Sequence, residues 1–166
     1  MGYVRMTALM SLVFALTAVN VAPAAAPKIV GGNDVQTRQY EAVNLARAGE
    51  VDEALQIIAS LRATTPDDQS LLYDETTILA WAGRDTEVMA NAAQLDPETA
   101  PEYLLTAVAK SARNVQRFDE AAIWYQAALA RRPDNLDARL GLAMTQGDGG
   151  LHQQARATLD ALAPRT

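Results

Sequence analysis

The chain has no cysteine, only two phenylalanines and a single histidine among its 166 residues. Without cysteine it can form neither a disulfide framework nor a thiolate zinc site, and it has no thiol to carry a lipid. Aromatic residues make up only 5% of the sequence, whereas apolar residues as a whole make up 49% and alanine is abundant. This composition excludes a disordered chain and favours closely packed helices over a β-sandwich. The length is enough for one domain with a real core.

Basic residues are also scarce. Lysine and arginine number 14 against 20 aspartates and glutamates, which gives a net charge of −6. Nucleic-acid binding depends on many lysine and arginine contacts to phosphates, so we expect no nucleic-acid partner. An acidic surface is compatible with cationic partners.

The N-terminus begins with a short basic stretch, MGYVR, followed by an uncharged apolar run, MTALMSLVFALTAV, and then by small residues, NVAPAAA. This is the layout of a secretory signal peptide, and the run is shorter than the ~20 residues that cross a bilayer. The Ala22–Ala24 stretch fits an A-x-A site. We therefore predict a signal peptide at residues 1–24 and a linker at residues 25–34, with an uncleaved membrane anchor as the alternative. Cleavage removes Arg5 and no acid, so the net charge becomes −7.

The remainder of the chain repeats itself at a period near 34 residues. GEVDEALQIIASLRATTPDD (49–68) and QRFDEAAIWYQAALARRPDN (116–135) share a turn, an Asp-Glu-Ala step and a closing Pro-Asp. Such a period is typical of stacked helical hairpins, none of which can bury its apolar face alone. Placing the turn at position 15 of each unit gives four repeats, at residues 35–68, 69–101, 102–135 and 136–166.

Equivalent positions of the four units hold similar residues. Position 8 is always small and position 20 nearly always so, which predicts that the two helices of each hairpin cross closely at these points. The residues at position 8 are Ala42, Thr76, Ala109 and Ala143, and those at position 20 are Ala54, Val88, Ala121 and Ala155.

The turn inside each unit requires a left-handed residue. Gly49, Gly83 and Gly150 directly follow the first predicted helix of their units, where a helix commonly ends in that conformation. The third unit lacks the glycine, so Asn114 or Gln116 must take its place.

The period, the small residues at positions 8 and 20, and a proline near position 32 resemble the tetratricopeptide repeat. This resemblance implies an all-α fold: a solenoid of four helix-turn-helix repeats that form a right-handed superhelix, with an inner groove lined by the first helix of each unit. The match is most specific in the first and third units. Arg38 and Arg139 stand at position 4 of the outer units, where the family generally has a bulky apolar residue, which indicates frayed ends or capping roles.

Residues suited to catalysis are almost absent. His152 stands at position 17, where an aromatic residue normally packs between helices, so we expect it to pack. Of the acidic pairs at 67–68, 74–75 and 119–120, two fall near helix starts, where carboxylates bind free N–H groups. The glycine-rich stretch at 147–150 lacks the Lys-Ser of a phosphate loop and is predicted as a turn. We therefore predict no enzyme, no cofactor and no metal site.

Six residues of the first helices are candidates for ligand binding in the inner groove. The aromatic members predict a wall that stacks on sugars or extended peptides, and the polar members supply groups that bind carboxylates or amide oxygens. The alternative is that Trp81 fills the gap between units and that the charges form a solvated face. The candidates are Tyr73, Trp81, Tyr103, Lys110, Arg113 and Asn114.

Two stretches, ILAWAGRDTEV (78–88) and AKSARNVQRFDEAAIWYQAALARRPDNLDARLGLAMTQGDGG (109–150), resemble the periplasmic repeats of poly-β-1,6-N-acetylglucosamine export porins. The resemblance covers residues 40–163. It implies a periplasmic scaffold, associated with the outer membrane, that binds the partly de-N-acetylated polymer or its deacetylase.

The sequence departs from that family because it stops at Thr166 without the strands of a barrel. By this resemblance we expect either a fragment or a partner that covers the last helix. A second function stays open: a general adaptor between proteins in envelope assembly, with a peptide in the groove.

Overall fold

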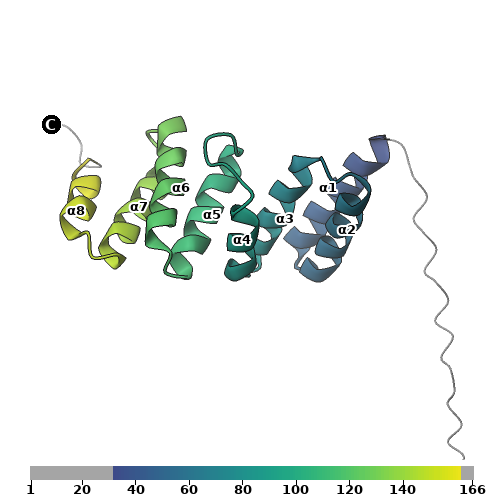
Figure 1. Cartoon of the computed structure of the whole chain (residues 1–166), viewed down its shortest axis with the longest axis horizontal. Coiled ribbons are helices and arrows are strands. Elements are labelled where there is room, and N and C mark those ends of the chain that lie inside the picture. Colours follow the sequence, from purple (N-terminus) through teal and green to yellow (C-terminus); the bar gives the residue numbers. More distant parts are fainter. Residues whose placement is uncertain (1–31, 162–166) are drawn as a thin grey trace, which may run out of the picture.

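In the computed structural model, residues 32–161 are described, and they form eight α-helices and no strand (Figure 1). The all-α prediction is therefore confirmed. The predicted signal peptide lies outside the described residues, and α1 begins inside the segment 25–34 that was predicted as a linker. The four hairpins are α1 (Gly32–Ala48) with α2 (Val51–Thr64), α3 (Gln69–Trp81) with α4 (Asp85–Ala92), α5 (Glu102–Asn114) with α6 (Phe118–Arg131), and α7 (Leu136–Asp148) with α8 (His152–Asp160).

The hairpins follow one another along the long axis of the molecule (Figure 1). The first helices α1, α3, α5 and α7 contact one another in that order, and α2, α4 and α6 each pack against the first helix of the next hairpin. Hairpins that are not adjacent make no contact within the described residues, which is the nearest-neighbour arrangement of a solenoid. Of the helices described, none combines the length and the apolar character needed to cross a membrane.

The small residues predicted at the helix crossings are buried. All four residues at position 8 are buried, and so are Ala54, Val88 and Ala121 at position 20. Ala155 is only half-buried because α8 packs against α7 alone among the described helices. His152 is exposed for the same reason, so the expectation that it packs between helices is wrong.

The turns within the hairpins have the predicted left-handed residues. Gly49, Gly83 and Gly150 have φ angles of 96°, 70° and 81°, and Gln116 takes the equivalent place in the third unit with φ 62°. In every unit the N–H of the following residue donates to the carbonyl oxygen five residues back, at 2.7 to 2.9 Å. These bonds satisfy carbonyls that the helix end would otherwise leave without a partner.

Replacing Gln116 by glycine is expected to raise the free energy of unfolding by about 0.5 to 1 kcal/mol. A left-handed conformation costs an L-residue roughly 1–2 kcal/mol, and the greater freedom of glycine in the unfolded chain offsets only part of that relief. The matched control is Gln126→Gly in the middle of α6, where the same substitution is expected to cost about 1 kcal/mol. Urea unfolding followed by circular dichroism measures both, and effects of the same sign contradict the strain at Gln116.

Within residues 32–161 most of the buried apolar side chains form two clusters. Leu55 is half-buried and packs against both of them. The N-terminal cluster contains Ala42, Ala46, Ala54, Ile58, Leu61, Leu71 and Ile78. The main cluster contains Leu79, Val88, Met89, Ala92, Ala100, Leu104, Leu105, Val108, Ala109, Ala112, Ala121, Trp124, Tyr125, Ala128, Ala138 and Leu142.

Candidate functional site

A groove of about 740 Å³ lies between α3 and α5 and reaches α6 and α7. Four of the six predicted site residues line this α3–α5 groove, namely Trp81, Tyr103, Lys110 and Asn114. The two aromatic side chains are open to solvent, with 50% of Trp81 and 53% of Tyr103 exposed. A residue that only filled the gap between two units would be more deeply buried, so Trp81 is available for contact with a ligand.

A second hollow of about 390 Å³ adjoins the groove on the side of α1. Trp81 and Tyr103 line this α1–α3 hollow as well, together with Val43, Arg47 and Asp74 among others. The two aromatic residues therefore form a wall common to both spaces, which makes one continuous surface across α1, α3 and α5.

Arg47 lies over the Trp81 ring, with its guanidinium carbon 5.6 Å from the ring centroid. This is a cation–π contact, worth about 0.5 to 1 kcal/mol at an exposed site. It fixes the orientation of the ring at the end of α3 while half of the side chain remains open.

Asp74 is a residue of this site that the sequence analysis missed. Gln39 donates to its Oδ2 at 2.8 Å, and the Tyr103 hydroxyl lies 3.5 Å from its Oδ1, at the limit of a hydrogen bond. Burial raises the pKa of the Asp74 carboxyl, and the hydrogen bonds from Gln39 and Tyr103 oppose that rise. The sequence showed only an acidic pair, 74–75, with no sign that its first member faces the hollow.

Burial and the neighbouring Asp74 raise the pKa of Tyr103 to about 12. The phenol therefore stays protonated at neutral pH and remains a hydrogen-bond donor. Its aromatic face and its hydroxyl group both lie at the boundary between the α3–α5 groove and the α1–α3 hollow.

The other predicted residues differ in whether they line this surface and in whether their side chains already have a partner. Tyr73 packs against the main cluster and lines neither the groove nor the hollow. Arg113 forms an ion pair with Asp148 of α7 at 2.8 Å. Asn114 lines the groove but donates to Asp85 Oδ2 at 3.0 Å. Lys110 has no hydrogen-bond or ion-pair partner within the described part of the chain.

A row of exposed apolar side chains follows α7 beyond the groove. Leu136, Leu140 and Met144 are spaced four residues apart and are 66%, 48% and 43% exposed. Asp137, next to Leu136, is a lining residue of the groove. None of the three lines the groove itself, so the row is an exposed apolar stripe on the helix that carries this lining residue.

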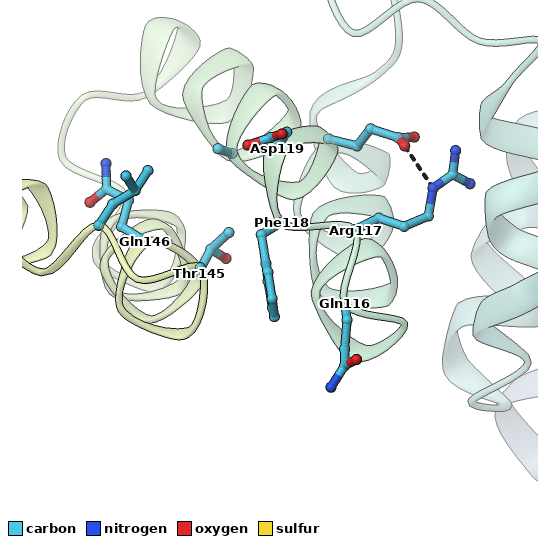
Figure 2. A pocket seen from close by; sticks show the side chains of 10 residues that line it. Gln116, Arg117, Phe118, Asp119, Thr145 and Gln146 are labelled. Carbon is cyan, nitrogen blue, oxygen red and sulfur yellow. Dashed lines mark hydrogen bonds and ion pairs between the residues drawn. The ribbon is translucent and has the colours of Figure 1, made fainter.

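A separate cavity of about 340 Å³ lies where the α5–α6 turn meets the end of α7 and the start of α8 (Figure 2). This edge cavity shares no lining residue with the groove or the hollow. No pattern in the sequence indicated this cavity. Its lining residues are Gln116, Arg117, Phe118, Asp119, Glu120, Ala122, Thr145, Gln146, Gly149 and Leu151.

Comparison with known proteins identifies the fold. A family model described as tetratricopeptide repeat matches residues 115–166. The solved structure of MamA AMB-1 aligns with a TM-score of 0.65 at 18% identity, over 76% of this chain and 75% of that one. The chain has a tetratricopeptide-repeat fold. MamA MSR-1 aligns with a TM-score of 0.63 at 16% identity, over 81% of this tetratricopeptide-repeat chain and 83% of that one. At such identities the likeness shows the fold alone.

A second comparison supports the resemblance to export proteins. The tetratricopeptide-repeat chain is 30% identical over 124 residues to the poly-beta-1,6-N-acetyl-D-glucosamine export protein of Escherichia coli strain K12, and equally to that of Escherichia coli O157:H7. The match covers 74% of this chain and 15% of the length of those relatives.

Proposed function

We propose that this tetratricopeptide-repeat scaffold acts by binding in the export of poly-β-1,6-N-acetylglucosamine. In this proposal it is exported to the periplasm, associates with an outer-membrane porin, and holds the partly de-N-acetylated polymer or its deacetylase. The observation that carries the proposal is the half-exposed wall of Trp81 and Tyr103, in a chain 30% identical to export proteins for that polymer.

The groove has suitable chemistry for an amino sugar. The faces of Trp81 and Tyr103 supply flat apolar surface against which a sugar ring can stack. Asp74 lines the hollow, and Asp85 and Asp137 line the groove, so carboxylates are present on both sides of the wall to receive an ammonium group. Lys110 supplies a free donor for the carbonyl oxygen of an acetamido group.

The charge of the scaffold also favours a cationic polymer. All 20 acidic residues but only 11 of the 14 basic residues fall within residues 32–161, which gives this part of the chain a net charge of −9. Such a field attracts positively charged ligands and raises their association rate at low ionic strength. We further propose that the protein is not an enzyme, because His152 lies on α8 and lines neither the groove nor the hollow.

Titration with partly de-N-acetylated β-1,6-glucosamine oligomers is expected to produce a saturable change in tryptophan fluorescence. Trp81 is half exposed and reports on the groove, whereas Trp124 is 4% exposed and reports on the core. Replacing Trp81 or Tyr103 by alanine is expected to weaken binding about fivefold, because each aromatic contact is worth about 1 kcal/mol. Calorimetry measures the Trp81→Ala variant, which lacks the fluorescent reporter.

The matched control is Tyr40→Ala, since Tyr40 is 67% exposed but lines neither the groove nor the hollow. It should bind the oligomers as the unmodified protein does. Fully acetylated and β-1,4-linked oligomers serve as ligand controls and should bind less tightly. Equal affinity for all three ligands, or full affinity in both groove variants, contradicts the proposal.

The exposed row on α7 favours a second candidate, an adaptor that binds a peptide of another envelope protein. Leu136, Leu140 and Met144 offer apolar contacts at helical spacing, which a sugar polymer uses poorly. If the oligomers do not bind, capture of a protein from envelope extract that is lost in Leu140→Asp and retained in Tyr40→Ala favours this function.

A further inference from the structure

The edge cavity lies at a junction where one position of the repeat holds a different type of residue than in the two preceding units. The residue that directly follows the left-handed turn is Arg84 in the second unit and Arg117 in the third, but Leu151 in the fourth. Because the units stack in register, the same position of successive units meets the same part of the preceding hairpin. Arg117 pairs with Glu120 of its own hairpin, whereas Arg84 contacts the preceding hairpin and so shows what the equivalent place near Leu151 can hold.

Between the first two hairpins this place is occupied by a guanidinium group. Arg84 Nη1 lies 3.5 Å from Oδ1 of Asp52, the second residue of α2. The same guanidinium makes two hydrogen bonds of 2.6 Å to Glu87. Arg84 thus joins its own hairpin to the preceding one through a carboxylate at the start of the second helix.

Between the last two hairpins the carboxylate is present and the guanidinium is missing. Asp119 is the second residue of α6, as Asp52 is of α2, and it lines the edge cavity. It has no hydrogen-bond or ion-pair partner among residues 32–161. Leu151 stands where Arg84 stands in the second unit, and a cavity of about 340 Å³ is left at this junction.

The nearest arginine does not fill the cavity. Figure 2 shows the Arg117 side chain extending away from Thr145 and Gln146. Its Nε donates to Oε1 of Glu120 at 2.6 Å. The Phe118 side chain lies between the α7 residues and Gln116, so an aromatic group forms part of the wall (Figure 2). The cavity therefore combines an aromatic side chain, the aliphatic Leu151 and a carboxylate without a partner.

We propose that the edge cavity binds an arginine side chain of a partner protein. The aliphatic stem lies against Leu151 and Phe118, and the guanidinium reaches Asp119, as Arg84 reaches Asp52 two junctions earlier. Arginine fits this lining better than lysine because its planar head stacks on an aromatic face and forms forked hydrogen bonds to a carboxylate. This site is independent of the α3–α5 groove, so the scaffold can hold a protein there while the groove is occupied.

The test is a titration of the full chain with N-acetyl-arginine-methylamide, followed by NMR of the Leu151 methyl groups. Saturable shifts are expected with the arginine derivative. The neutral citrulline analogue, which has the same shape, and the lysine derivative are expected to bind about three- to tenfold more weakly. Binding of the citrulline or lysine derivative as tight as that of arginine overturns the assignment of a guanidinium site.

Two variants locate the site. Asp119→Asn is expected to weaken arginine binding about three- to tenfold. Leu151→Arg is expected to abolish binding because the new side chain occupies the cavity itself. This variant lacks the Leu151 methyl groups, so its titration is followed by the NMR signals of the Phe118 ring. Asp67→Asn, which removes an exposed carboxylate far from the cavity in sequence, is the matched control. Unchanged binding in Asp119→Asn or Leu151→Arg overturns the proposal. Asp119→Asn should still bind the glucosamine oligomers. A negative result for arginine binding in the edge cavity can therefore be distinguished from a negative result for oligomer binding in the groove.

Discussion

Replacing Gly141 by leucine is expected to lower the free energy of unfolding by about 3 kcal/mol. Gly141 lies on α7 where the ring of Tyr125 crosses it, and even a Cβ atom at this position would overlap the ring. Tyr125 is only 5% exposed and belongs to the main cluster, so moving the ring breaks its packing in the core. The added side chain must therefore displace the ring or push α7 away from α6.

The matched control for this prediction is Gly147→Leu on the same helix. A Cβ atom at Gly147 would meet nothing within 4 Å beyond the local helix backbone, and its φ is not in the left-handed region. Because leucine favours a helix more than glycine does, this variant is expected to gain up to about 0.5 kcal/mol. Urea unfolding followed by circular dichroism compares the two variants. A loss of the same size at both positions means that the contact with Tyr125 is not the cause.

Replacing Tyr125 by alanine is expected to cost about 3 kcal/mol. The substitution removes a ring that packs between α6 and α7 and leaves a space that the surrounding helices fill only in part. Tyr125→Phe serves as the control, since it keeps the ring and removes a hydroxyl group for which the structure gives no hydrogen bond. Thermal and urea unfolding should place Tyr125→Phe within about 1 kcal/mol of the unmodified protein.

The double variant links the two predictions. In the Tyr125→Ala background, Gly141→Leu is expected to cost far less than about 3 kcal/mol, because leucine then occupies the space that the ring has left. The coupling between the two positions should be on the order of 2 kcal/mol. Additive losses would show that the two residues do not compete for one space.

The parts of the fold that the sequence predicted are those that recur in every unit. Ala42 and Ala109 occupy the same position of different units and are both fully buried. Gln116 was one of two candidates for the missing glycine because the hairpin has the same turn in all units, and its φ of 62° confirms that requirement. A shared environment makes such positions predictable without coordinates.

Contacts particular to one junction escaped prediction. Arg113 was expected to face a ligand, but the next unit supplies Asp148 within reach and the two form an ion pair. Asp74 went unnoticed because its role depends on Gln39 of the preceding hairpin and on Tyr103 of the following one. Position within a repeat shows which way a side chain faces, whereas its partner depends on the residue that the neighbouring unit places opposite.

The division of the core into two clusters has a consequence for how this scaffold opens. The N-terminal cluster ends at Ile78 and the main cluster begins at Leu79, so the boundary runs between adjacent residues of α3. In a solenoid each block of hairpins has its own stability, and the smaller block can unfold while the larger one persists. The wall of Trp81 and Tyr103 stands beside this boundary and borders a hollow on one side and a groove on the other. A chain-like ligand lying across both spaces would oppose unfolding of the first hairpin, because the loss of α1 and α2 from the fold would then also require release of part of the ligand.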